Sequence, residues 1–220
     1  FDLETLARVR DTSVEGALED LTEAINEGMI SRIGDDYAFH HDRIQEAAYS
    51  LVGAEQRSAL HYRIGKLTLD STAAGDLPGK LFYIVDQLNN GVDMIRDGPE
   101  RLALVRLNLQ AGRKAKASAA YAAAFQYLQR GIDLLGADAW NQQYDLALEL
   151  YTEATEAAYL MGDYDKMNDR ADVALKHART LLEKIRIFTS QINARIARED
   201  YQGAIDVAMP IMEIITPKFG

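Results

Sequence analysis

Cysteine is absent from this chain of 220 residues. Its absence excludes a disulfide framework, a thiolate zinc site and a cysteine nucleophile, and it suits a reducing, cytoplasmic location. Long apolar runs are absent too: none approaches the roughly 18 residues that a spanning helix needs, so we expect no membrane contact. The opening stretch, FDLETLARVR, lacks the basic and then apolar pattern of a signal peptide.

Basic residues are scarce relative to acidic ones, with 24 Lys and Arg against 34 Asp and Glu and a net charge of −10. This excess disfavours binding to nucleic acid or to anionic lipid. Apolar residues make up 48% of the chain and charged residues 26%, the balance of a folded globular protein. The chain does not begin with Met and stops at TPKFG, directly after an apolar helical pattern, so we expect a piece of a longer protein.

Residues 1–42 mix short elements. Ser13 can cap a helix that runs to about Gly28, and Gly28 can end it. Two apolar stretches on either side of Gly34-Asp35-Asp36 predict a short β-hairpin, so the order of elements is typical of a winged-helix unit. The helix SVEGALEDLTEAINE has five acidic residues and no basic one, so we expect it to pack and switch instead of binding DNA. Its apolar positions are Val14, Leu18, Leu21 and Ile25.

From residue 43 to residue 220 the strand signals disappear and helical periodicity takes over. Breaks at glycine, proline and aspartate leave short connections between the helices. The predicted fold class is all-α, with a winged-helix remnant and its hairpin in 1–42 and a helical repeat array in 43–220. The expected helices cover residues 42–52, 54–72, 79–91, 100–115, 117–135, 139–161, 164–179, 181–198 and 201–215.

Three tyrosines mark a recurring unit in the array. Tyr121, Tyr164 and Tyr201 lie 43 and 37 residues apart, close to the period of helix-hairpin repeats. We expect such hairpins to stack, each covering one face against its neighbour, and the alternative is an ordinary helical bundle. A small or medium residue follows each tyrosine three positions later and an apolar one seven positions later (Ala124, Met167 and Ala204; then Leu128, Ala171 and Ala208).

The stretch FHHDR carries the densest polar chemistry. His40 and His41 are adjacent, so on a helix they point about 100° apart and cannot hold one metal ion together. A triad of Ser50, His41 and Asp42 lacks the G-x-S-x-G turn that exposes a serine nucleophile. The paired carboxylates of the first helix fit a solvated face. We therefore expect no metal site and no catalytic residue, and hence no enzyme activity in this chain.

The same stretch also fits a helix start. Asp42 and Gln45 have the D-x-x-Q spacing of a capping box, so we expect Asp42 to cap a helix with a buried stripe. The N–H groups at a helix start favour anions, and His41 beside them adds a donor, so a phosphate contact stays open as the alternative to plain capping. The expected buried stripe consists of Ile44, Ala47, Ala48 and Leu51.

Three further features are assigned to structure. GDLPGKL, at 75–81, is one residue short of a Walker loop and ends in Leu, so we expect a loop in which Gly79 opens a helix. The basic cluster from Arg113 to Lys116 is interpreted as a solvated face or a match to a helix C-terminus, with an anion or partner site as the alternative. Trp140 is expected to anchor a core.

The stretch YLMGDYDKM, at 159–167, resembles the turn between the helices of tetratricopeptide repeats, although the early Trp-Leu-Gly pattern of that family is missing. The resemblance implies a tetratricopeptide-like superhelix whose concave face binds a protein or a neighbouring domain.

Five ordered stretches resemble the large multi-sensor hybrid histidine kinases and serine/threonine kinases of bacteria, and related histidine kinases of fungi. They are FHHDRIQEAAYSLV, RSALHYRIGKLTL, KLFYIVDQLNNG, LNLQAGRKAKASAAYAAAFQYLQRGIDLL and YDLALELYTEATEAAYLMGDYD. In that family a kinase-like region and a STAND-type AAA ATPase precede the helical region, and GAF and histidine kinase modules follow. His40-His41-Asp42 is similar to the Met-His-Asp motif that ends the winged helix of STAND ATPases, with His in place of Met. The resemblance implies that His41 touches the β-phosphate of ADP in the upstream ATPase.

These interpretations predict a regulatory arm of a two-component signalling protein, which binds a partner and transmits a signal to ATPase and kinase modules. We expect no cofactor in this chain, and ATP or ADP with Mg²⁺ in the longer parent. The alternative is a stand-alone scaffold for protein–protein interaction, and an enzyme domain would need polar residues converging in a deep pocket. A homodimer can form through an exposed apolar helix such as AMPIMEII, at 208–215.

Overall fold

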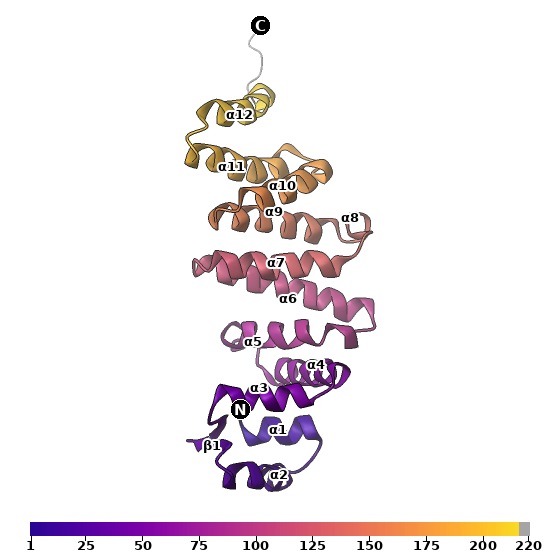
Figure 1. The fold of residues 1–220 in the computed structure, drawn as a ribbon. Helices are drawn as coiled ribbons and strands as arrows, with labels where there is room; N and C mark the ends of the chain where they lie inside the picture. The colour runs from indigo at the N-terminus through magenta and orange to yellow at the C-terminus, as the bar shows by residue number, and fades with distance from the viewer. Residues whose placement is uncertain (216–220) are drawn as a thin grey trace. The chain divides into compact units, whose positions relative to one another are not determined.

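The computed structural model describes the backbone of residues 1–215 and the side chains of residues 1–212. Within that range the chain forms twelve α-helices, one short 3₁₀-helix and one antiparallel hairpin (Figure 1), which confirms the predicted all-α class with a small hairpin. Contacts divide it into two compact units, Phe1–Arg96 and Asp97–Gly220, called here the first and the second unit. The predicted domain boundary after residue 42 rests on the change in the sequence from short mixed elements to helical periodicity, and it stays a prediction.

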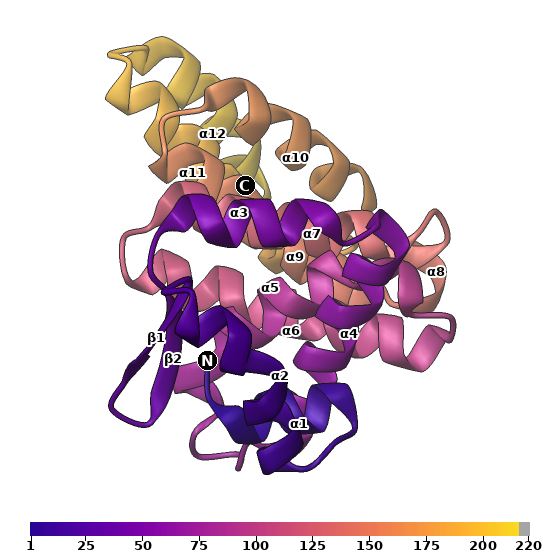
Figure 2. The same cartoon turned by 60° about the horizontal axis from the view of Figure 1, so that its bottom comes forward.

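The first unit begins with two helices and the hairpin, in which Ile30 lies opposite Phe39. Figure 2 shows the hairpin beside the N-terminus, where the Tyr37 N–H donates to the Phe1 carbonyl at 2.7 Å. The elements of this unit are α1 (Leu3–Arg10), α2 (Val14–Asn26), β1 (Ile30–Ile33), β2 (Asp36–Phe39), α3 (Asp42–Leu51), α4 (Ala54–Ser71), α5 (Leu77–Asn90) and the 3₁₀-helix η1 (Val92–Met94).

Local polar caps fix the first two helix starts. The Ser13 hydroxyl accepts a hydrogen bond from the Gly16 N–H at 3.0 Å, which confirms the predicted cap of α2. Gly28, with φ of +70°, follows α2 in the left-handed conformation that ends many helices. Helix α1, for which no bounds were predicted, is capped by Asp2: the Asp2 carboxylate accepts from the Thr5 N–H at 2.6 Å.

Helices α4 and α5 form the most closely packed part of the first unit. Ile84 and Val85 of α5 are fully buried. Gly65 of α4 permits the close approach, because a Cβ at this position would lie 2.8 Å from the side chain of Leu88. The missing side chain thus lets one helix seat directly against the other.

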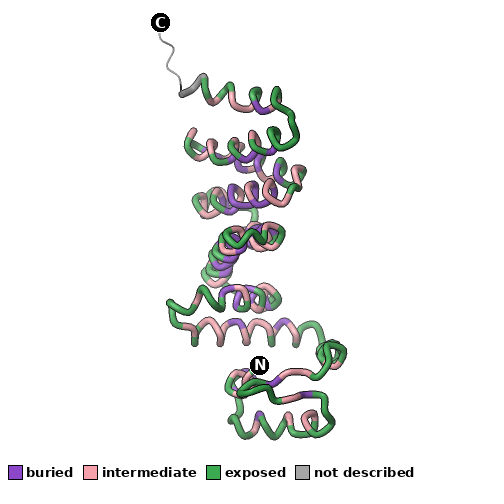
Figure 3. The backbone as a smooth tube through the Cα atoms, turned by 90° about the vertical axis from the view of Figure 1, so that its left-hand side faces the viewer, coloured by how far each residue is buried: buried purple, intermediate pink, exposed green. Residues whose placement is uncertain are grey.

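The second unit is a succession of helix pairs. Helix α6 packs on α7, α9 on α10 and α11 on α12, while α7 also contacts α9 and α10 contacts α11. Figure 3 shows buried residues along the facing sides of these helices. The predicted helix at 139–161 is interrupted at Gln143, which leaves one short helix and one long one. The elements are α6 (Gly98–Ala117), α7 (Tyr121–Leu135), α8 (Ala139–Gln142), α9 (Tyr144–Leu160), α10 (Tyr164–His177), α11 (Leu181–Ala197) and α12 (Tyr201–Ile215).

The three recurring tyrosines occupy equivalent places: Tyr121, Tyr164 and Tyr201 are the first residues of the second helix in each pair. Two residues before each tyrosine the chain turns with a positive φ, and the next N–H reaches back to a carbonyl five residues earlier. The three turns are Ala119 (φ 58°) with the bond from Ala120 to Ala115, Gly162 (φ 80°) with Asp163 to Ala158, and Glu199 (φ 59°) with Asp200 to Arg195.

Burial follows the predicted pattern after each tyrosine. The residues three positions later are buried in all three pairs, and seven positions later Leu128 and Ala171 are fully buried, while Ala208 is half-buried. One local unit therefore recurs three times in the second unit, as the spacing predicts, whereas membership in the tetratricopeptide family stays a prediction. The three buried residues at the earlier position are Ala124, Met167 and Ala204.

The predicted dimer segment at 208–215 belongs to α12, where Met209 is 50% exposed. The side chains of residues 213–215 and the whole of TPKFG, at 216–220, lie outside the described residues. None of the described helices is long and apolar enough to cross a membrane.

Candidate functional site

Strand β2 leads into α3 through His40 and His41. The His40 N–H donates to the Met29 carbonyl at 2.9 Å, which extends the hairpin. Nδ1 of His40 lies 3.0 Å from Oγ of Ser31, and its ring meets the His41 ring edge-on, with 5.0 Å between the centroids. The His41 ring is exposed and makes no capping hydrogen bond. Both histidines are therefore exposed at the start of α3, and the hairpin engages the ring of His40 through Ser31.

The predicted capping box at Asp42 is wrong. The N-cap residue is His41, whose backbone is extended (φ −142°, ψ 143°) and whose carbonyl accepts from the N–H groups of Ile44 and Gln45. Asp42 is the first helical residue, one position beyond the place from which a side chain closes a cap. Its carboxylate still lies in the first turn, where negative charge is favourable.

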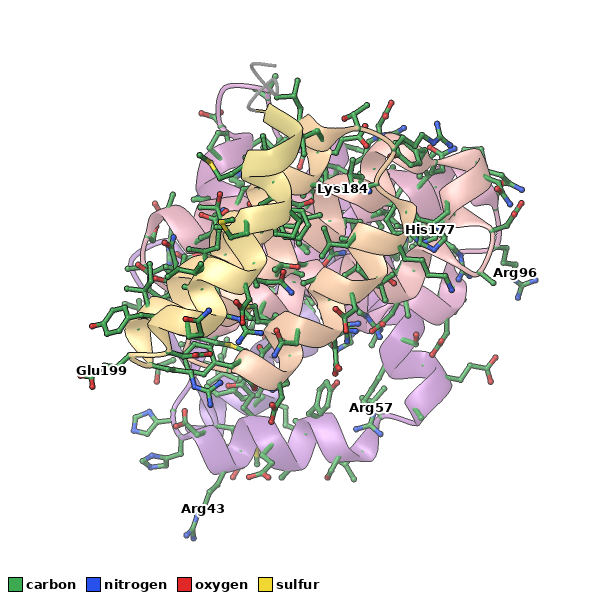
Figure 4. The ribbon with its side chains drawn as sticks, turned by 90° about the horizontal axis from the view of Figure 1, so that it is seen from above. Arg43, Arg57, Arg96, His177, Lys184 and Glu199 are labelled. Carbon is green, nitrogen blue, oxygen red and sulfur yellow. The ribbon has the colours of Figure 1, made fainter. Side chains whose placement is uncertain are left out.

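The predicted buried stripe of α3 is also wrong. No residue of α3 is buried, and Leu51 at its end is 87% exposed. Ile44 and Ala48 are half-buried, and Ala47 is exposed. The reason is that α3 packs mainly on β2 and has few contacts with the other helices of the first unit. Figure 4 shows Arg43 extending outward from the beginning of this helix.

A chain of polar contacts fastens α3 to α4 and α5. The Tyr49 hydroxyl lies 2.9 Å from Nε2 of His61, and Nδ1 of His61 lies 2.7 Å from Oε1 of Gln87. Because an amide oxygen only accepts, Nδ1 donates to it and Nε2 accepts from the tyrosine. The guanidinium of Arg57 lies over the Tyr49 ring, 4.9 Å from its centroid. His61, isolated in the sequence, is therefore a link between three helices.

A cleft of about 810 Å³ lies within the first unit, between α1, the hairpin, the start of α3, α4 and α5. Lys80 lines it and belongs to the GDLPGKL stretch, which enters α5 at Leu77 and not at Gly79 as expected. Lys80 therefore stands on the first turn of a helix. Burial, followed by the charge of Asp2, raises the pKa of Tyr83 on the same wall. The aromatic residues of the cleft are Phe1, Tyr37, Phe39 and Tyr83.

The strongest polar constellation lies in the second unit, around the carboxylate of Glu153 on α9. Its Oε2 accepts from Lys116 Nζ at 2.5 Å, and its Oε1 accepts from Arg113 Nε and Arg186 at 3.2 Å each. The side chain of Glu153 is only 6% exposed. Two basic residues come from α6 and one from α11, so a single buried carboxylate joins the first helices of three successive pairs.

Two more carboxylates complete this network. Glu149 pairs with Arg113 at 3.1 Å, and Glu156 pairs with Lys116 at 2.6 Å. Burial raises the pKa of Glu153, but the hydrogen bonds and charges of Lys116, Arg186 and Arg113 outweigh it, so the pKa lies below its ordinary value. We call Glu153, its three basic partners and these two carboxylates the Glu153 network.

The interpretation of the basic cluster at 113–116 as a solvated face is wrong for Lys116, whose side chain is 18% exposed and paired. It does lie in the last turn of α6, where positive charge matches the helix C-terminus. The sequence alone did not single out Glu153, since it is one glutamate among several on α9. A usable signal was its position, four residues after Glu149 and three before Glu156 on one helix face.

Trp140 lies in an aromatic cluster at the end of the second helix pair. Its ring stacks on His177, with 4.2 Å between centroids and 6° between planes. Tyr144 meets Trp140 at an angle and donates its hydroxyl to Glu183 at 2.8 Å, so burial and this bond raise the pKa of Tyr144. The guanidinium of Arg179 lies over the Tyr144 ring, 3.6 Å from its centroid. Trp140 is half-buried and joins α8, α9 and α10.

No group of three His, Asp or Glu side chains in the described part of the chain is arranged to hold a metal ion. His41 and the Glu153 network lie in different units, and the prediction that His41 touches a nucleotide stays untested by this geometry.

Neither a protein-family model nor a solved structure matches the chain. The chain is similar to hybrid signal transduction histidine kinase G of Dictyostelium discoideum, with 28% identity over 167 residues. This alignment covers 65% of the chain and 5% of that protein. The chain therefore has a distant similarity to a signal-transduction histidine kinase, and it corresponds to a small part of the length of that relative.

Proposed function

We propose that this chain is a regulatory helical arm of a signalling protein of the hybrid histidine kinase type. It binds a partner or a neighbouring domain and transmits the signal to ATPase and kinase modules. The observation that carries the proposal is the similarity to a hybrid histidine kinase. In this proposal the arm is not itself an enzyme and holds no cofactor, and ATP or ADP with Mg²⁺ belongs to the parent.

The Glu153 network supplies a physical means of transmission. A partner that contacts α6, α9 or α11 acts on side chains that are already coupled to the other two helices through one carboxylate. Coupling between sites requires that the partner bind one arrangement of the helices better than another. Because one carboxylate links α6, α9 and α11, a partner that contacts one helix pair shifts the arrangement of the next pair.

The nucleotide link of the proposal is tested at His41. In the full-length parent, His41→Ala is expected to weaken retention of ADP, measured by equilibrium binding of a fluorescent ADP analogue. His40→Ala is the matched control, because both histidines are exposed, but the His40 ring is engaged by Ser31 at 3.0 Å whereas the His41 side chain makes no capping hydrogen bond. Unchanged ADP affinity in His41→Ala, or an equal loss in both variants, contradicts the switch.

A stand-alone scaffold is the second candidate function, favoured by the recurring helix pairs of the second unit. Pull-down experiments with and without the ATPase region of the parent separate the two functions. The regulatory arm requires that the presence of the ATPase region change which partners are captured, whereas a scaffold captures the same partners in both cases.

A further inference from the structure

The net charge of the chain is concentrated in one short segment. Residues 1–42 contain eleven Asp and Glu against three Arg, a net charge of −8, whereas the whole chain carries −10. Five of these acidic residues stand on or directly after α2. A local excess of this size produces a negative potential that attracts cationic groups.

Helix α2 also leaves part of its apolar stripe exposed. Ala17 is its only buried residue, whereas Val14 and Leu18 are 41% and 40% exposed. Leu21 and Ile25, on the same side of the helix, are half-buried. The spacing of four, three and four residues places all four side chains in one row.

A row of carboxylates runs along this apolar stripe. Glu15, Glu19 and Glu23 follow one another at intervals of four residues, so they share a face of α2 that adjoins the stripe. All three are exposed, and within the described residues none of them has an ion-pair partner. This side of α2 therefore combines apolar contact area with unneutralised negative charge.

Helix α1 shows which chemistry α2 accepts. It packs on α2, Ala17 of α2 is buried, and Arg10 of α1 pairs with Asp20 of α2 at 2.8 Å. The packed side of α2 thus combines apolar contact with a charge pair to arginine. The side that carries Val14, Leu18 and the three glutamates, called here the free side, offers exposed apolar atoms and negative charge to a partner.

We propose that the free side of α2 is a docking surface for a basic amphipathic helix of a protein partner. The charge excludes nucleic acid and anionic lipid as occupants, and the apolar row distinguishes this face from a merely solvated acidic helix. The proposal goes beyond the regulatory arm, because it names the chemistry of a partner and a surface outside the Glu153 network. It holds or fails independently of the His41 experiment.

The probe is a synthetic helical peptide. Leu stands at positions one, four, five and eight of each eight-residue stretch, so that it forms one face of the helix, and Lys stands on both sides of that face. Calorimetric titration of the whole chain measures its affinity. The triple variant E15K/E19K/E23K is expected to weaken binding about tenfold or more, because three charge pairs at the contact are replaced by repulsion. Val14→Ser with Leu18→Ser is expected to weaken it about as much without changing charge.

The matched control reverses three other exposed acids of the same unit, in E55K/D70K/D93K, which changes the net charge equally. Its affinity is expected to stay within about twofold of the parent chain. Equal weakening of peptide binding in both triple variants overturns the proposal, because the attraction then comes only from the net charge of the chain. Unchanged binding in the α2 variants overturns it as well.

Self-association is checked by light scattering of the chain alone. A dimer that dissociates in V14S/L18S means that a second copy covers α2, and it overturns the assignment to a basic partner. If the parent chain and V14S/L18S are both monomers, the assignment of α2 to a basic partner is supported. Circular dichroism confirms that each variant keeps its helix content.

Discussion

Lys116 and Glu153 form an ion pair of 2.5 Å between Nζ and Oε2, although 37 residues separate them in the chain. Lys116 stands in the last turn of α6, and Glu153 lies in the middle of α9. Arg186 of α11 reaches the same carboxylate. A single side chain on α9 therefore links three helices.

Glu153→Gln is expected to lower the free energy of unfolding of the second unit by about 3 kcal/mol, because three basic groups lose one buried carboxylate. Trp140 is the single tryptophan and lies in this unit, so its fluorescence during urea unfolding measures the effect. Glu149→Gln is the matched control: its side chain is 47% exposed, and its loss is expected to cost less than about 1 kcal/mol. Equal losses of unfolding free energy in the two variants would show that the buried Glu153 stabilises the unit no more than the exposed Glu149 does.

The contribution of Glu153 is expected to depend on pH. Its folded-state pKa lies below its ordinary value of 4.5, so the unfolded chain binds the proton more readily. The stabilisation is present above that value and is lost as pH falls through the folded-state pKa. The difference in unfolding free energy between the parent chain and Glu153→Gln should therefore narrow as pH falls below 4.5.

Other acids with lowered pKa values, such as Asp163 and Asp200, are present in both proteins and cancel in this comparison. Urea midpoints at several pH values, followed by Trp140 fluorescence, provide the measurement. A difference that stays constant with pH would mean that Glu153 does not titrate as the geometry requires.

The turns before the recurring tyrosines predict opposite effects at equivalent positions. Gly162→Ala is expected to destabilise the second unit by about 1 kcal/mol, because its φ of +80° is unfavourable for a side chain. Ala119→Gly is expected to stabilise it by a smaller amount, since Ala119 adopts a φ of +58° at the equivalent position. Urea unfolding of both variants tests the pair, and effects of the same sign would contradict the equivalence.

Close helix packing predicts a different result at two glycines of α6. A Cβ at Gly112 would lie 2.5 Å from Cγ of Leu128 on α7, so Gly112→Ala is expected to cost about 1–3 kcal/mol. At Gly98 a Cβ meets nothing within 4 Å, so Gly98→Ala is expected to be neutral or slightly stabilising. Thermal unfolding followed by circular dichroism compares the two, and a tolerated Gly112→Ala would mean that α6 and α7 pack less closely than described.

Local chemistry accounts for what the sequence predicted well. Ser13 caps its helix, and the tyrosine spacing marks three helix starts, because caps, turns and apolar periodicity act over a few residues. The hairpin around Gly34 is likewise a local event, since its φ of +66° favours glycine. The predicted all-α class follows from such signals and needs no knowledge of long-range contacts.

The tertiary structure alone decided which apolar faces are covered and which charges meet. Helix α3 is amphipathic in sequence, yet Leu51 is exposed because α3 packs mainly on β2. In the sequence, Glu153 resembles an ordinary surface residue. In the structure, α6 and α11 bring Lys116 and Arg186 to it, although more than thirty residues separate each of them from Glu153. Periodicity specifies that a helix has an apolar or charged face, whereas only the packing of distant segments determines what that face contacts.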